Sequence, residues 1–241
     1  INGFQLSYHG LVDVCVLVIA GAMTTATGAK SFAGQSEQGA EPMNMNQPYC
    51  CPVGVAGPDA FWQPLPGLPT VGSKYPSDCT ELLGGCAPNV ARAIQEMGQP
   101  VRPVFLTGSD EWSSHVDSMV CREFSTALCL PLMSQTRRSV ILGDCCYSTS
   151  VTIERTALSE EAIDTIAGAE FVVVGPMGQA DHLLVEALLG YSNRAILLMS
   201  SQHLQDAEAA CDRASKAWIT IVNESELAVW AATRDPFAAH K

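Results

Sequence analysis

The stretch GGCAPNVARAI, residues 84–94, is the part of the sequence that indicates the fold most clearly. Gly84 and Gly85 have no Cβ, so a ligand or another segment can approach their backbone closely. A helix is expected directly after them, because Pro88 suits a first turn and apolar residues recur at helical spacing from Val90 onward. The unpaired N–H groups and the positive dipole end of that helix would face the same spot. The pattern predicts a cradle for a polar ligand or, more simply, a glycine turn that leads into a buried helix.

The composition is typical of one α/β unit. The chain has 241 residues, of which 47% are hydrophobic and 16% charged, with 14 prolines and 19 glycines. This length can bury one sizeable core, or one core and a small appendage. The net charge of −12 argues against a nucleic-acid partner, because such binding needs clustered Lys and Arg, and Arg137-Arg138 is the only adjacent basic pair in the sequence. A small-molecule ligand or a protein partner remains open.

The ten cysteines do not form a recognisable framework. Cys50-Cys51 and Cys145-Cys146 are adjacent pairs and the other six are scattered, with no C-x-x-C and no zinc-type cluster. In a chain of this size the pattern predicts buried, reduced thiols in a cytoplasmic protein.

The first 42 residues differ from the rest. Residues 11–23 are almost entirely apolar, yet this run is too short to span a bilayer and no Lys or Arg precedes it. Met43 and Met45 stand just before the first convincing strand. We therefore expect residues 1–42 to be an extension or leader, residues 43–241 to be the folded domain, and no membrane partner.

Strand-like and helical segments alternate from residue 49 onward. Strands are expected at 52–56, 101–107, 171–174, 195–199 and 218–222, and helices at 88–97, 114–123, 159–168, 180–189, 204–216 and from about 225. Two segments rich in Thr, Val and Ile, 139–142 and 148–154, are typical of strands joined by a turn. The alternation predicts a parallel sheet with right-handed crossovers. No G-x-G-x-x-G or P-loop motif is present, which disfavours classical dinucleotide and P-loop binding.

Two polar side chains accompany the glycines. Asp59 is expected just past the carboxyl end of the first strand, where open α/β sheets bind their ligands. A carboxylate there can accept hydrogen bonds from two hydroxyls of a polyol, although an Asp-containing turn explains it equally well. Asn89 follows the glycines, and its side-chain amide can both donate and accept.

Two further polar segments end later strands. Asp110 lies in the loop 107–112, where we expect it to cap the following helix rather than to take part in chemistry. Asn223 and Glu226 lie one helical turn apart at the end of the strand at 218–222. This pair suits a water-bridged Mg²⁺ near phosphates, since Mg²⁺ keeps waters and takes few protein oxygens. The simpler interpretation is a helix N-terminal cap with acidic residues.

Together these features resemble the ribokinase-like (PfkB-type) carbohydrate kinases, over the chain from about residue 52 to its end. Residues 84–93, with the segment 98–110 that follows, match the first signature of that family in spacing. Asn223-x-x-Glu226 is similar to its N-x-x-E motif, and Asp59 to the early Asp that holds sugar hydroxyls in such kinases.

The resemblance implies an α/β fold, namely a three-layer sandwich with a mainly parallel sheet and a small β lid. The lid strands would lie near 70–83 and 139–154 and would close over the sugar. In a homodimer, the two subunits would contact each other through this lid. The implied reaction transfers the γ-phosphoryl group of ATP to the hydroxymethyl group of a sugar or nucleoside.

The resemblance also assigns roles to individual residues. Those that would bind the sugar or nucleoside are Asp59, Gly84, Gly85 and Asn89. Asn223 and Glu226 would place the phosphates of ATP, and Glu226 would be the residue nearest Mg²⁺.

The sequence departs from the family pattern near its end. The second signature of the family, a Gly-Ala-Gly-Asp turn with the catalytic base, is expected well after Glu226 and therefore beyond Lys241. The segment 197–201 also lacks the Asp usual at that strand end. We therefore expect an incomplete kinase domain without its C-terminal part and with no catalytic residue of its own. A non-catalytic sugar- or nucleoside-binding module is the alternative, and an α/β interaction domain without a ligand is a third hypothesis.

Overall fold

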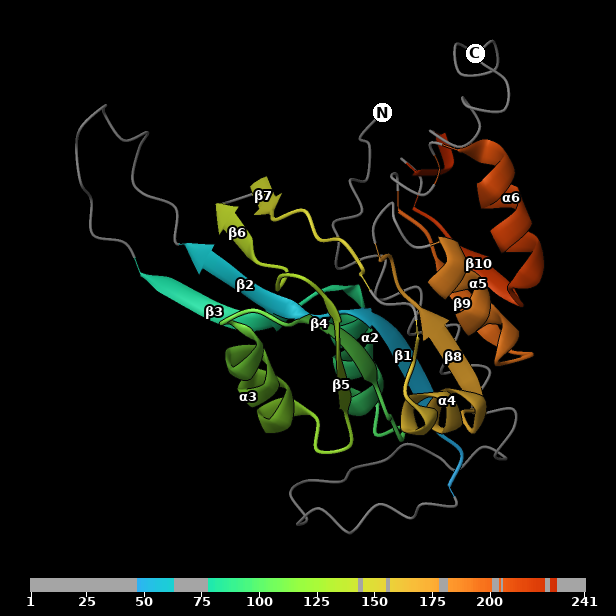
Figure 1. Cartoon of the computed structure of the whole chain (residues 1–241), viewed down its shortest axis with the longest axis horizontal. Helices are drawn as coiled ribbons and strands as arrows, with labels where there is room; N and C mark the ends of the chain where they lie inside the picture. The colour runs from blue at the N-terminus through green and yellow to red at the C-terminus, as the bar shows by residue number, and fades with distance from the viewer. Residues whose placement is uncertain are drawn as a thin grey trace.

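The larger of two sheets has six strands, all parallel, in the order β10-β9-β8-β1-β4-β5 (Figure 1). The computed structural model describes residues 47–62, 78–142, 145–154, 157–177, 182–200, 204, 206–223 and 226–228. The strands of this sheet are β1 (Cys50–Val55), β4 (Val104–Gly108), β5 (Leu128–Met133), β8 (Phe171–Val174), β9 (Ala195–Leu198) and β10 (Ile219–Ile221). The parallel α/β architecture predicted from the sequence is confirmed.

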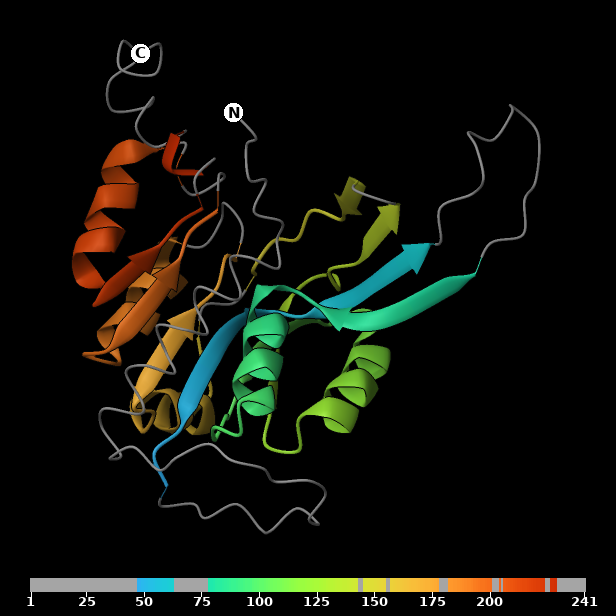
Figure 2. The same ribbon diagram turned by 180° about the vertical axis from the view of Figure 1, so that it is seen from behind.

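A second sheet of four strands, in the order β3-β2-β6-β7, continues from the first. Its strands are β2 (Gly57–Trp62), β3 (Cys79–Gly84), β6 (Ser139–Leu142) and β7 (Cys145–Ser148). β2 pairs antiparallel with β3 and parallel with β6, and β6 pairs antiparallel with β7. Only Ala56 separates β1 from β2, so the chain passes directly from an inner strand of the large sheet to an inner strand of the small one (Figure 2).

Helices cover both faces of the large sheet, which makes three layers. On one face lie α2 (Cys86–Glu96) and α3 (Ser113–Glu123), and on the other lie α4 (Glu160–Ala167), α5 (His182–Gly190) and α6 (Ala207–Lys216). Alternate residues of β1 supply the two cores, because successive side chains of a strand point to opposite faces. Val53 and Val55 pack with α4 and α5, whereas Cys50 and Ala56 pack with α2 and α3.

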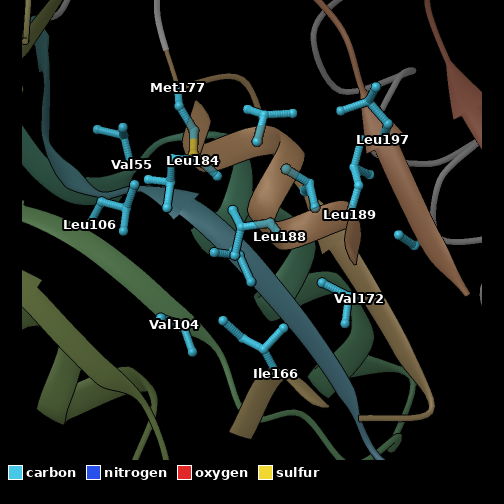
Figure 3. Packing of buried hydrophobic residues seen from close by; sticks show 14 of the residues in the cluster. Val55, Val104, Leu106, Ile166, Val172, Met177, Leu184, Leu188, Leu189 and Leu197 are labelled. Atoms are coloured by element: carbon cyan, nitrogen blue, oxygen red, sulfur yellow. The ribbon is translucent and has the colours of Figure 1, made fainter. Parts of the chain in front are cut away.

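The larger core lies between the sheet and helices α4 and α5 (Figure 3). Leu184 and Leu188 of α5, together with Ile166 of α4, are fully buried against strand residues such as Val55 and Val172. Each such side chain contributes about 1.5–3 kcal/mol on burial. β1 and β8 are buried along their whole length, as expected for parallel strands covered on both faces.

The helix ends follow local sequence signals. Gly98 adopts a φ of 70° after α2, where its N–H donates to the Gln95 carbonyl and the N–H of Gln99 to the Ile94 carbonyl. This hydrogen-bond pattern is a Schellman motif. α4 lies within the helix predicted at 159–168, and it begins after Ser159, whose hydroxyl accepts a hydrogen bond from the backbone N–H of Ala162. None of the helices that the structure describes combines the length and the apolar character that a membrane span requires.

Several predicted boundaries are wrong. Asp59 lies just past the carboxyl end of β1, as expected, but it is part of β2 rather than of a turn, because β2 is paired on both sides, with β3 and with β6. The strand expected at 148–154 is instead β7, Cys145–Ser148, and beyond it Ile153 forms only a single bridge with Met133.

The segments expected to form the lid are described only in part. β3 overlaps the first of them, 70–83, and β6 and β7 fall within the second, 139–154. Residues 1–46, with the expected extension, and 63–77, with the start of the first lid segment, lie outside the described residues.

The thiols are less uniformly buried than predicted. The cysteines whose side chains the structure describes form no disulfide, but of these only Cys50 and Cys51 are buried, whereas Cys79, Cys121 and Cys146 are exposed. The exposed thiols lie on the small sheet and on the outer side of α3.

Candidate acceptor-binding site

The site lies where the strand order of the large sheet reverses. From β1 the chain builds outward to β4 and β5, and then returns to the other side of β1 to add β8, β9 and β10. Open α/β sheets bind ligands outside the carboxyl ends of the strands at such a point. The carboxyl end of β1 leads directly to Asp59 on β2, and β3 leads back to α2, so both predicted elements of the site return to this point.

Gly85 forms the N-cap of α2 with a φ of 115°, a conformation that favours glycine. A Cβ on Gly85 would lie 2.3 Å from the carbonyl oxygen of Val55 at the end of β1. Gly175, just after β8, faces the same turn of the helix, and a Cβ there would lie 3.7 Å from the backbone nitrogen of Ala87, an ordinary van der Waals distance. The first turn of α2 therefore rests directly on the carboxyl ends of β1 and β8.

Asp59 and Gly84 are in contact, as the predicted site requires. A Cβ on Gly84 would lie 1.9 Å from Oδ2 of Asp59, so the carboxylate occupies the space that any other residue at position 84 would fill. Asp59 is 9% exposed. The glycine at position 84 is thus needed to seat the Asp59 carboxylate beside the N-terminus of α2.

Arg137 is a member of this site that the sequence did not reveal. Its Nη1 donates a 2.8 Å hydrogen bond to Oδ1 of Asp59, in an ion pair whose side chains are 18% and 13% exposed. The signal available in the sequence was the Arg137-Arg138 pair in an otherwise acidic chain. Only the fold brings it to Asp59, which lies 78 residues earlier.

The loop that carries Arg137 is held by Asp110. The buried Thr136 donates its backbone N–H and its hydroxyl to the Asp110 carboxylate, at 3.0 and 2.5 Å. Burial acts to raise the pKa of Asp110, but the hydrogen bonds from Thr136 and from the backbone N–H of Trp112 outweigh it and lower the pKa below 3.8. Asp110 therefore anchors this loop, but it does not cap α3 as expected, because the N-cap residue of that helix is Trp112 and no side chain accepts a capping hydrogen bond there.

Asn89 is oriented by Arg92, one turn later on α2. Nη1 of Arg92 donates to Oδ1 of Asn89 at 2.9 Å, Nη2 donates to the Leu83 carbonyl at 3.0 Å, and both Nε and Nη2 donate to Glu123 of α3. Because a guanidinium has donors only, it fixes the oxygen side of the Asn89 amide and leaves the NH₂ side to donate elsewhere.

Asn223 and Glu226 form a capping box at the carboxyl end of β10. The backbone N–H of Asn223 donates to Oε2 of Glu226 at 3.0 Å, and the backbone N–H of Glu226 donates to Oδ1 of Asn223 at 2.7 Å. Within the described residues, Oε1 of Glu226 has no hydrogen-bond donor, and no group of three His, Cys, Asp or Glu side chains is placed to hold a metal. Among the described residues, one carboxylate oxygen of Glu226 is therefore not engaged by the capping box.

The two parts of the predicted site are not in contact. β10 lies three strands from β1, a separation of about 14 Å at the usual strand spacing. Asp59, Gly84, Gly85 and Asn89 meet around the start of α2, whereas Asn223 and Glu226 lie farther along the same edge of the sheet.

The fold is that of the ribokinase-like carbohydrate kinases. The structure is similar to a candidate ribokinase from Agrobacterium tumefaciens, with a TM-score of 0.60 and 17% identity over 79% of this chain and 64% of that one. It is also similar to an Arabidopsis thaliana ribokinase complexed with ribose and ATP, with a TM-score of 0.52 and 15% identity over 80% of this chain and 68% of the other. A third similar structure is a nucleoside kinase from Methanocaldococcus jannaschii, an archaeal member of the ribokinase family. Its TM-score is 0.55, with 14% identity over 78% of this chain and 64% of that one.

These similarities are at the level of the fold. No protein-family model matches the chain, and no curated protein matches it. The chain spans 64% of the length of the Agrobacterium protein.

Proposed function

We propose that this chain carries the acceptor-binding half of an ATP-dependent kinase that phosphorylates a sugar or nucleoside hydroxymethyl group. The observation that carries the proposal is the Asp59 carboxylate seated against Gly84, beside the N-terminus of α2. A carboxylate held there accepts hydrogen bonds from hydroxyl groups. The Asn89 amide, whose oxygen is held by Arg92, supplies the complementary donor.

In this proposal ATP binds at the same edge of the large sheet as the acceptor, namely at the carboxyl ends of its strands. Glu226 and Asn223 would place the phosphates of ATP, with Mg²⁺ held through water at Oε1 of Glu226. Bound there, Mg²⁺ would supply charge neutralisation for the transferred phosphoryl group, and this together with alignment of the reactants would supply most of the rate. The residues of this chain orient the acceptor and exclude water from it.

The small sheet is proposed as the lid of the site and as a dimer surface. The register pairs Trp62 with Leu142 and Val140 with Tyr147, which places all four on one face of the small sheet. They are 39–65% exposed. A second copy of the chain would cover them.

Light scattering tests this dimer surface. The wild type should be a dimer that Leu142→Glu dissociates, whereas Leu183→Glu, at an exposed leucine of α5, should leave the dimer intact. A monomeric wild type would contradict the proposal.

A sugar- or nucleoside-binding module without catalysis is the second candidate. The capping box favours this candidate, because the side chains of Asn223 and Glu226 already accept hydrogen bonds from backbone N–H groups at the start of a helix. We place either protein in the cytoplasm, in keeping with the free thiols of the described residues.

Calorimetry separates these candidates. The protein is titrated with D-ribose, D-fructose, 2-keto-3-deoxygluconate and adenosine, with and without Mg-ATP, and ATP turnover is measured in parallel. Binding with turnover supports the kinase, binding without turnover supports the module, and no binding to any of the four contradicts both. Asp59→Asn should weaken binding by about 1–3 kcal/mol, the cost of a charge-assisted hydrogen bond. Glu161→Gln, an exposed change on α4, serves as the matched control.

A further inference from the structure

The fold brings Arg137 into the candidate acceptor site, although no sequence signature points to it. It directly follows Thr136, which is fully buried, and lies two residues before Ser139, the first residue of β6. From there its side chain reaches Asp59 on the neighbouring strand β2.

The backbone of Arg137 is fixed on both sides. Before it, Thr136 donates two hydrogen bonds to Asp110. Beside it, the carbonyl oxygen of Arg137 lies 1.9 Å from the position that a Cβ on Gly57 would take, so this approach needs glycine at position 57. A side chain carried on so constrained a backbone is well suited to hold a ligand, because little freedom remains to be lost on binding.

The ion pair is not needed to join β2 to β6. The two strands are already paired by their backbones from Asp59 and Ser139 onward. Within the described residues, Asp59 is the only hydrogen-bond partner of the Arg137 guanidinium, which has five N–H donors and a side chain that is 18% exposed. Donors therefore remain at the point where the acceptor is expected to bind.

We propose that Arg137 binds the acceptor directly and forms, with Asp59, a donor–acceptor pair for two adjacent hydroxyl groups of a polyol. Each hydroxyl can donate a proton and accept one. One hydroxyl donates to the Asp59 carboxylate, and the oxygen of its neighbour accepts from the guanidinium of Arg137. This inference rests on the proposed function, and it narrows the acceptor to a molecule with a vicinal diol at this position.

The test compares two neighbouring arginines by calorimetry. Arg137→Gln and Arg137→Lys remove or reshape the donor fork, whereas Arg138→Gln removes an equal charge whose guanidinium instead stacks on Trp112, 5.0 Å from the ring centre. Thermal unfolding of each variant shows that it is folded. Each is titrated with the four acceptors named above and with 2-deoxy-D-ribose, which lacks one hydroxyl of the ribose pair.

We expect Arg137→Gln to lower affinity for the bound polyol by about 10-fold or more, and Arg138→Gln to lower it by less than about 3-fold. Arg137→Lys should recover only part of the loss, since an ammonium cannot reproduce the planar fork. The preference for ribose over 2-deoxyribose should shrink in Arg137→Gln. If Arg137→Gln binds the polyol as well as or better than wild type, Arg137 is only the ion-pair partner of Asp59 and the inference is overturned. Should Arg137→Gln not fold, the same result for Arg137→Lys overturns it. A wild type that binds none of the probes overturns the proposed function as well.

Discussion

Arg92 donates a 2.9 Å hydrogen bond to Oδ1 of Asn89 while the same guanidinium binds the carbonyl of Leu83, the residue directly before Gly84. One side chain thus links the two parts of the glycine segment, namely the strand that enters it and the helix that leaves it. Glu123 of α3 accepts hydrogen bonds from Nε and Nη2 of that guanidinium, the second at 2.6 Å. The orientation of Asn89 is therefore set by a network that spans α2, β3 and α3.

Arg92→Lys should reduce both stability and acceptor affinity. A lysine keeps the charge, but it cannot serve Asn89, Leu83 and Glu123 together, so at least one charge-assisted hydrogen bond is lost. The free energy of unfolding, measured in urea, should fall by about 1.5–3 kcal/mol. Arg122→Lys, at an exposed position of α3, should change the free energy of unfolding by less than about 0.5 kcal/mol. Equal effects of the two variants would show that the Arg92 network contributes nothing specific.

Gly84→Ala should abolish acceptor binding by displacing Asp59. The new methyl group would lie 1.9 Å from the carboxylate, which must rotate away or carry its strand with it. Gly190→Ala is the matched control, because a Cβ there meets nothing within 4 Å. Calorimetry with the same acceptors measures the loss, and an unchanged affinity in Gly84→Ala would mean that Asp59 does not contact the ligand.

Asp110→Asn should destabilise the protein in a pH-dependent way. The folded state lowers the pKa of Asp110, so the stabilisation is fully present above the unfolded value of 3.8 and is lost as the pH falls through the lower folded value. Urea unfolding should therefore show wild type about 1–3 kcal/mol more stable than Asp110→Asn at pH 7, with a gap that narrows below pH of about 4. A gap that stays constant from pH 7 down to pH of about 2 would contradict the anchor role of the carboxylate.

The thiols should separate into two classes on alkylation. Burial raises the pKa of Cys50 and Cys51, and it raises that of Cys129 to about 12. At pH 8 these three should resist iodoacetamide in the folded protein, because the thiolate is the reacting species. The exposed group, Cys79, Cys121 and Cys146, should be modified. Peptide mapping by mass spectrometry identifies the sites, and rapid labelling of Cys50 would show that β1 is not held in the core.

The parts of the fold that could be predicted from the sequence are those with a strong local signal. The apolar run at 171–174 is β8, the glycine segment precedes α2, and Ser159 caps α4. β5 was missed because Pro131 interrupts its pattern. The strand tolerates that proline since it lies at the edge of the sheet.

The errors and omissions in the site share a physical cause. Gly57 and Pro58 favour a turn locally, but pairing with β3 and β6, which are distant in the sequence, makes the segment a strand. Arg137 could not be assigned to Asp59 from spacing, because the contact depends on how the small sheet is assembled. The N-x-x-E motif remained ambiguous because a capping box and a phosphate-side carboxylate use the same two residue types.

The central claim, that the acceptor binds at the start of α2, can be tested by nuclear magnetic resonance on protein labelled with ¹⁵N-glycine. Amide signals of Gly84 and Gly85 are assigned with alanine variants and followed as D-ribose, D-fructose, 2-keto-3-deoxygluconate or adenosine is added. We predict that both signals shift with an acceptor that binds, while Gly98, at the other end of the same helix, and Gly190, at the end of α5, stay in place. Binding that moves Gly98 or Gly190 but leaves Gly84 and Gly85 unchanged would contradict the site described above.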